Sequence, residues 1–244
     1  MEGKMRFGLA SYEFKNNDIS FNLSQIEKAI KEAKEKDVQL LCFGETFLQG
    51  FESLKWKYED DKQVAVSLDS DEIYYIKELS RKYEMDLFIG FVELEPANEK
   101  LYSSYVLIEN GRIKYNYRRI SKNWKEYEKT DEHYCEGDRV ENIVYKGKNL
   151  STGLCGDLWI FPERFKTDSI LIWPVFVDFS LEEWETEMLD YAQQANLISQ
   201  NVLMVNSICK DKVCVSHGGA FYFKNGEIMD KTKFDNEQVL AVEL

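Results

Sequence analysis

The chain has 244 residues, 44% of them apolar and 14% aromatic, which is enough to bury a hydrophobic core without disulfides or a structural metal. Its formal net charge of −13 argues against nucleic acid or an anionic membrane as a partner, because both bind clustered Lys and Arg. No apolar run reaches the roughly 18 residues of a membrane span, and no Pro-, Gly- or Ser-rich linker divides the chain, so we expect one domain over residues 1–244.

The first half of the chain alternates strands and helices. Leu23, Ile26, Ile30 and Ala33 recur at helical spacing and predict a helix over about 20–36. In chain order we predict a strand over 6–11, this helix, a strand over 38–43, a helix over 70–83 and a strand over 87–94.

The second half carries two hairpin signals, Asn110-Gly111 and Asn225-Gly226. The predicted elements are strands over 102–109, 112–118 and 150–154, a short helix near 161–165, a strand over 169–173 ended by Pro174, a helix over 181–199, and strands over 202–206, 217–223, 227–230 and 239–242. This order predicts an α/β fold with mixed sheets and helices on their outer faces.

Cys155 is the first candidate for chemistry. An apolar strand delivers it into the tight turn Gly153-Leu154-Cys155-Gly156-Asp157. At such a turn a thiol stands clear of the sheet, and nearby backbone N–H groups, that of Gly156 included, can meet a developing oxyanion. Taken alone, Cys155 also fits a buried structural cysteine.

Glu45 is the second candidate, because it directly follows the apolar run 38–43. A carboxylate at the end of a buried strand is partly desolvated, which suits it to accept a proton. The third candidate is the basic stretch 117–126, whose cations can stabilise a tetrahedral intermediate. Alone, each also fits a solvated loop.

Together, the order and contexts of these segments resemble the nitrilase superfamily of carbon–nitrogen hydrolases, which uses a Glu–Lys–Cys triad. The family's Pro-Glu motif appears here as Gly44-Glu45, and its Cys-Tyr-Asp motif as Cys155-Gly156-Asp157, followed by Phe161-Pro162-Glu163. The resemblance extends over nearly the whole chain. It implies a four-layer αββα sandwich that forms a homodimer.

The resemblance also implies the chemistry. Cys155 attacks the carbonyl of a small amide, or a related carbamoyl or ω-amide group, and Glu45 takes the thiol proton. A thioester forms, and water then cleaves it. The expected partner is a small-molecule amide, without a cofactor. No spacing of His and Cys resembles a metal site, so we also expect no metal.

One departure from the family pattern affects the triad itself. The family's Tyr-Arg-Lys motif supplies the triad Lys, but the matching triplet here ends in Arg119. A lysine reaching in from the same loop can replace it, and we predict Lys125, flanked by Trp124 and Glu126, with Lys122 or Arg119 itself as alternatives. The further Glu that lines such sites is assigned to Glu126, with Glu132 behind it.

Two other functions remain open from the sequence. The chain can be a member of this fold that binds a ligand and has lost its chemistry, as the Arg119 departure allows. It can also be a cysteine hydrolase of another fold, which would need a later histidine, and His217 is the candidate.

The five cysteines, an odd number without a regular spacing, predict reduced thiols rather than a disulfide framework. The chain also begins without the apolar segment of a signal peptide. Both features predict a cytoplasmic location.

Overall fold

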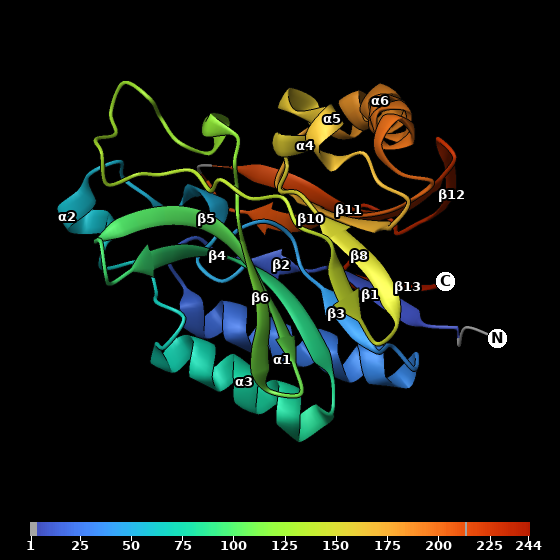
Figure 1. Cartoon of the computed structure of the whole chain (residues 1–244), viewed down its shortest axis with the longest axis horizontal. Coiled ribbons are helices and arrows are strands. Elements are labelled where there is room, and N and C mark those ends of the chain that lie inside the picture. Colours follow the sequence, from blue (N-terminus) through green and yellow to red (C-terminus); the bar gives the residue numbers. More distant parts are fainter. Residues whose placement is uncertain (1–3, 213) are drawn as a thin grey trace.

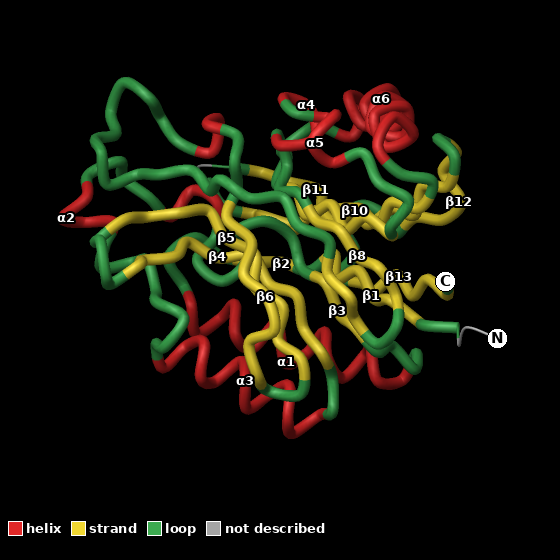
Figure 2. Tube along the Cα trace, viewed as in Figure 1, coloured by secondary structure: helices red, strands yellow, loops and turns green. Residues whose placement is uncertain are grey.

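The computed structural model describes residues 4–212 and 214–244. Two mixed sheets lie face to face, and helices cover the outer face of each, so the chain forms four layers (Figures 1 and 2). This arrangement confirms the predicted α/β sandwich. No helix in the described part of the chain is long and apolar enough to cross a membrane.

The first sheet has six strands. Their order is β13 (Gln238–Glu243), β1 (Arg6–Ser11), β3 (Leu40–Cys42), β4 (Asp86–Glu95), β5 (Lys100–Glu109) and β6 (Arg112–Arg118). Strands β1, β3 and β4 are parallel, and the remaining pairs are antiparallel. The carboxyl end of β3 therefore faces the same edge as that of its parallel neighbours, and Glu45 lies beyond it.

The second sheet repeats this plan. Its order is β12 (Glu227–Lys231), β11 (Val215–Lys224), β10 (Asn201–Lys210), β9 (Ile170–Val175), β8 (Lys148–Thr152) and β7 (Ile143–Tyr145), and β2 (Glu13–Phe14) also pairs with β10. Strands β8, β9 and β10 are parallel. The chain leaves the end of β8 toward Cys155.

Helices α1 (Ile19–Glu35) and α3 (Asp71–Tyr83) cover the first sheet, and α4 (Asp157–Ile160), α5 (Pro162–Phe165) and α6 (Leu181–Ile198) cover the second (Figure 1). The long helices have side-chain caps, and α6 begins with a capping box between Ser180 and Glu183. A short helix α2 (Tyr58–Asp61) and two 3₁₀ turns, η1 (Phe51–Ser53) and η2 (Lys122–Trp124), lie in the connecting loops.

The core has two main parts. One packs the buried faces of α1 and α3 against the first sheet, through residues such as Ile30, Ile76 and Leu87. The other fills the space between the sheets and continues to α6, with Phe88, Trp173 and Trp184 fully buried. Such dense packing fixes the strand ends, and with them the segments that carry the candidate site.

The predicted strand and helix order is confirmed, but the predicted end of β9 at Pro174 is wrong. Pro174 lies inside the strand, opposite Val205 of β10. Its carbonyl accepts a hydrogen bond of 2.9 Å from the Cys155 N–H on the side where β8 has ended. The missing N–H of Pro174 faces that same side, so it removes no ladder bond.

Candidate active site

Cys155 lies in the turn between β8 and α4, with a φ of +42°. Residues other than glycine rarely adopt this left-handed region, and such strain persists where surrounding contacts hold it. The Cys155 N–H donates to the Pro174 carbonyl at 2.9 Å, and the Cys155 carbonyl accepts from Trp173 Nε1 at 3.0 Å. The backbone is thus fixed from both sides, while the residue itself stays partly exposed.

Asp157 ties this turn to the segment that follows β6. Its buried carboxylate accepts four hydrogen bonds, from the backbone N–H of Leu154, Ile120 and Ser121 and from the hydroxyl of Tyr117, at 2.7–3.1 Å. Leu154 directly precedes Cys155, and Ile120 directly follows Arg119. The carboxylate therefore sets the distance between the candidate nucleophile and the basic loop.

Glu45 lies just beyond β3 and is fully buried. Its Oε1 accepts from Ser103 Oγ at 2.9 Å and from Arg119 Nη1 at 2.8 Å. Its Oε2 is buried and has no hydrogen-bond partner among the described residues. A buried carboxylate oxygen without a donor lowers the stability of the fold. In Glu45 this oxygen has no competing donor and can accept a hydrogen bond or a proton from a nearby group.

Arg119 brings its guanidinium into the same buried space. Nη1 donates to Glu45, Nε donates to Ser121 Oγ at 2.8 Å, and Nη2 donates to Asn123 Oδ1. These contacts use three of the five N–H groups of the guanidinium. Two N–H groups remain for another acceptor.

The charges at this centre act on the thiol. Burial, followed by the Glu45 carboxylate, raises the pKa of Cys155 to about 12, although Arg119 acts in the opposite direction. Near neutral pH the thiol is therefore protonated. Attack by this sulfur requires a base that removes the proton during the reaction, and Glu45 is the carboxylate whose charge it senses most.

Lys125, which we predicted as the cation of the triad, does not contact Glu45. Its Nζ donates to the Tyr134 carbonyl and forms an ion pair of 2.6 Å with Glu136. A lysine held by a nearby carboxylate has no free reach, and the guanidinium of Arg119 fills the place beside Glu45. In this structure the cation beside Glu45 is Arg119, and the choice of the catalytic cation stays a prediction.

The other predicted residues lie around the same loop. Lys122 is exposed and places its ammonium over the ring of Tyr127. Glu126 and Glu132 are exposed as well. Burial, and then the charges of Asp178 and Glu126, raise the pKa of Glu52, so Glu126 lies in an acidic group with these two residues.

Sequence reasoning missed Ser103, Ser121 and Asn123, which hold Glu45 and Arg119. Ser103 lies 58 residues from Glu45 along the chain. Ser and Asn are common in strands and turns for many reasons, so no local signal marks them. A contact of this kind emerges only when the register of β4 and β5 is known.

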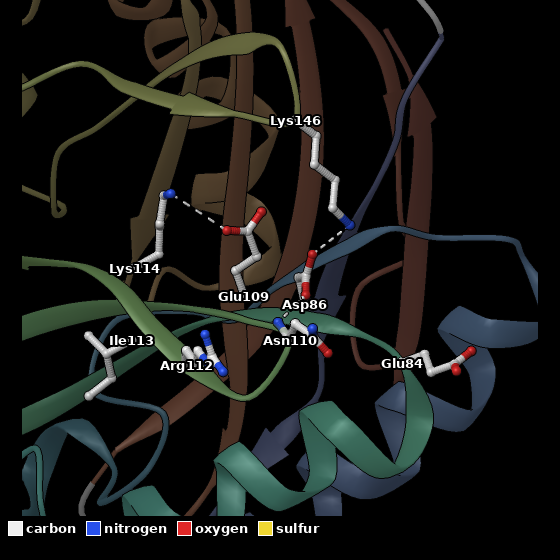
Figure 3. A pocket seen from close by; sticks show the side chains of 8 residues that line it. All are labelled: Glu84, Asp86, Glu109, Asn110, Arg112, Ile113, Lys114 and Lys146. Atoms are coloured by element: carbon white, nitrogen blue, oxygen red, sulfur yellow. Dashed lines mark hydrogen bonds and ion pairs between the residues drawn. The ribbon is translucent and has the colours of Figure 1, made fainter.

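A large hollow of about 640 Å³ lies elsewhere, lined by charged residues from the starts of β4 and β6 (Figure 3). Asp86 begins β4 opposite Leu40, the first residue of β3, so the hollow is at the far end of these strands from Glu45. Its charges pair with one another, Lys146 with Asp86 and Lys114 with Glu109 (Figure 3). We interpret it as a structural junction.

His217, which a cysteine hydrolase of another fold would need, pairs through Nδ1 with Asp235 at 2.8 Å. The two-sheet sandwich is not the fold of those enzymes, so that alternative is wrong. In the described part of the chain, no group of three or more His, Cys, Asp or Glu side chains is arranged to hold a metal ion.

A family model described as carbon–nitrogen hydrolase matches residues 7–166. A curated relative, the glutamine-dependent NAD(+) synthetase of Thermotoga maritima, is 25% identical over 161 residues, which cover 64% of this chain and 26% of the relative.

Solved structures share the fold. The glutamine-dependent NAD+ synthetase of Acinetobacter baumannii superposes with a TM-score of 0.82 at 15% identity, over 99% of this chain and 45% of that one. An amidase from Nesterenkonia sp. gives 0.78 at 18% identity, over 100% and 91%. Nit3 of Saccharomyces cerevisiae gives 0.74 at 17%, over 99% and 90%. The chain spans less than half of each synthetase.

Proposed function

This chain belongs to the carbon–nitrogen hydrolase family, and from that premise we propose that it hydrolyses a non-peptide C–N bond in a small amide through a thioester on Cys155. The observation that carries the proposal is the buried pair of Glu45 and Arg119. It leaves one carboxylate oxygen without a donor, and the charge of this carboxylate, after burial, raises the pKa of the Cys155 thiol.

In the proposed reaction, Glu45 Oε2 takes the thiol proton as Cys155 Sγ bonds to the carbonyl carbon. The carbonyl oxygen becomes an oxyanion and accepts hydrogen bonds from the Gly156 N–H and from a free N–H of Arg119. When the intermediate collapses, the C–N bond breaks and protonated Glu45 gives its proton to the departing ammonia or amine. Water then gives a proton to Glu45 and attacks the thioester. When this second intermediate collapses, the C–S bond breaks, the sulfur takes the proton back from Glu45 and leaves as a thiol, and the carboxylic acid is released.

Arginine can perform the electrostatic part of this reaction without moving a proton, because its guanidinium stays charged. All proton transfers then fall to Glu45. No metal or cofactor takes part in the proposal, and an arginine in the triad is compatible with activity. For the same reason we favour an enzyme over a ligand-binding member of the fold that has lost its chemistry.

The roles of the two cations are separable by mutation. We expect Arg119→Ala to lower kcat by about 10² to 10³, the usual cost of a lost oxyanion donor. Lys125→Ala should stay within a few fold of the parent, because Lys125 pairs with Glu136. Steady-state ammonia release measures both, with thermal unfolding as the check on folding. A collapse in Lys125→Ala with an active Arg119→Ala would restore our first assignment.

The substrate is the open part of the proposal. An ω-amide such as that of glutamine is a candidate, because both synthetase relatives are named glutamine-dependent. Ammonia release from glutamine, from a monoamide of a dicarboxylic acid and from acetamide would compare the substrate classes. Release from none of a broad set of amides, nitriles and carbamoyl compounds would argue for the non-catalytic alternative.

We further propose a homodimer that forms through the helical layer over the second sheet. This layer exposes the apolar side chains of Trp159, Ile160, Leu189 and Leu197 by 41–60%. Such a patch on a monomer favours association. Light scattering should give twice the 28.7 kDa chain mass, and Leu197→Glu should shift the protein toward monomer. A monomeric parent at micromolar concentration would contradict this proposal.

All five cysteines are free thiols, which supports the cytoplasmic location we propose. Fractionation of cells producing the protein would test it, and recovery with secreted proteins would overturn it.

A further inference from the structure

Two of the positions at which this chain departs from the family motifs, Arg119 and Gly156, lie against one another. Arg119 stands where the family has Lys, and Gly156 stands where it has Tyr after the nucleophile. A Cβ built on Gly156 would lie 2.6 Å from Arg119 Nη2 and 2.6 Å from both amide atoms of Asn123. The guanidinium and the Asn123 amide therefore occupy the space beside residue 156 that a side chain would fill.

Hydrogen-bond chemistry fixes the orientation of the Asn123 amide. The guanidinium only donates, so the amide atom that meets Arg119 Nη2 must be the acceptor Oδ1. The donor Nδ2 then lies on the other side of the amide, close to residue 156, and no described residue accepts from it. Asn123 as a whole is exposed.

The turn that carries Asn123 is held at both ends. The Ser121 N–H donates to Asp157 at 2.7 Å, so the start of the turn is attached to the Cys155 loop. Trp124, at its other end, is buried in a small apolar cluster with Leu54 and Tyr134. An amide on such a fixed turn is preorganised, which is what a donor to a developing charge requires.

We propose that Asn123 is a further catalytic residue, whose Oδ1 holds the Arg119 guanidinium and whose Nδ2 donates to the substrate carbonyl oxygen. This inference rests on the proposed function, in which Cys155 attacks an amide. The carbonyl oxygen then meets three donors, from Gly156, Arg119 and Asn123. A side chain at position 156 would clash with the arginine and the asparagine.

Acrylamide provides a test that does not need the natural substrate. Cys155 Sγ bonds to its terminal carbon, the C=C pair shifts to place negative charge on the carbonyl oxygen, and the adjacent carbon then takes a proton. Donors at that oxygen speed the reaction. Methyl methanethiosulfonate reacts with the same thiolate but has no amide. The acrylamide rate divided by the methyl methanethiosulfonate rate therefore measures recognition of the amide and does not depend on the fraction of Cys155 that is ionised.

Two variants separate the two roles of the side chain. Asn123→Asp keeps an oxygen for Arg119 but replaces the donor with a negative charge. Asn123→Ala removes both. Lys122→Ala, an exposed neighbour on the same turn, is the matched control. Labelling of Cys155 is followed by mass spectrometry of the digested protein, and thermal unfolding shows that each variant is folded.

We expect the rate ratio to fall at least tenfold in Asn123→Ala, to fall further in Asn123→Asp, and to stay within twofold in Lys122→Ala. If Asn123→Asp keeps the parent ratio while Asn123→Ala loses it, the residue only positions Arg119 and the donor role is overturned. Parent-like ratios in both variants, or equal losses with both reagents, overturn the inference as well. If neither reagent labels Cys155 selectively in the parent protein and acrylamide releases no ammonia, the proposed function itself fails.

Discussion

Replacement of Cys155 by Ala should abolish turnover, with kcat reduced by at least about 10⁴, because the nucleophile of a covalent mechanism cannot be bypassed. The turn is held by the Cys155 backbone, through Pro174 and Trp173, and the sulfur adds a single long contact of 3.8 Å with the Phe176 carbonyl, so the fold should persist. Ammonia release measures activity, and circular dichroism with thermal unfolding measures folding.

A matched control is available in Cys135, which is also partly exposed and lies outside the buried pair. Cys135→Ala should keep full activity. In the parent protein, a substrate that acylates the enzyme should add its acyl mass to Cys155 alone. Retained turnover in Cys155→Ala, or an acyl group on another cysteine, would remove Cys155 from the mechanism.

The regular elements were predictable because their patterns are local. The spacing of Leu23, Ile26 and Ile30 specifies one buried helix face, and α1 buries it against the first sheet. Asn110-Gly111 predicts a hairpin, and β5 and β6 form one. The short elements β2, β7 and η2 were not predicted, since two or three residues carry no period and form only where a neighbouring strand or loop offers partners.

The site residues that could be predicted are those with a reactive side chain directly after an apolar strand. Glu45 and Cys155 each follow an apolar strand, β3 of the first sheet and β8 of the second, and the two sheets pack face to face. The choice of cation could not be made this way. Arg119 and Lys125 lie six residues apart on one loop, and the direction of each side chain depends on Ser121, Asn123 and Glu136, which the sequence does not place.

The contact between Gly156 and Arg119 could not be predicted from the sequence either. We expected it to contribute a backbone N–H to an oxyanion, a role that remains a proposal. Its lack of a side chain also leaves room for the guanidinium of Arg119, 37 residues away along the chain in the segment that Asp157 attaches. The sequence around Gly156 alone does not show which distant residue lies against it in the fold.

Glu45→Gln should lower kcat/KM by at least about a hundredfold, the scale of a lost general base. The amide keeps the volume of the carboxylate, and its oxygen can still accept from Ser103 and Arg119. Its nitrogen, in the place of Oε2, cannot take the thiol proton. The variant also leaves the buried charge of Arg119 without its carboxylate, so thermal unfolding must show that the protein is still folded before the loss is assigned to the base.

The Glu45→Gln variant also tests whether one carboxylate serves both halves of the reaction. Deacylation needs a base for water, so any thioester that forms on Cys155 should persist rather than turn over, and intact-protein mass spectrometry after mixing should detect it.

Ser103→Ala provides the control, since it removes one neutral donor to Glu45 and leaves the carboxylate in place. We expect this control to lose far less activity. A parent-like pH–rate profile in Glu45→Gln, with normal release of the acyl group, would show that another residue is the base. The free oxygen of Glu45 would then need a different explanation.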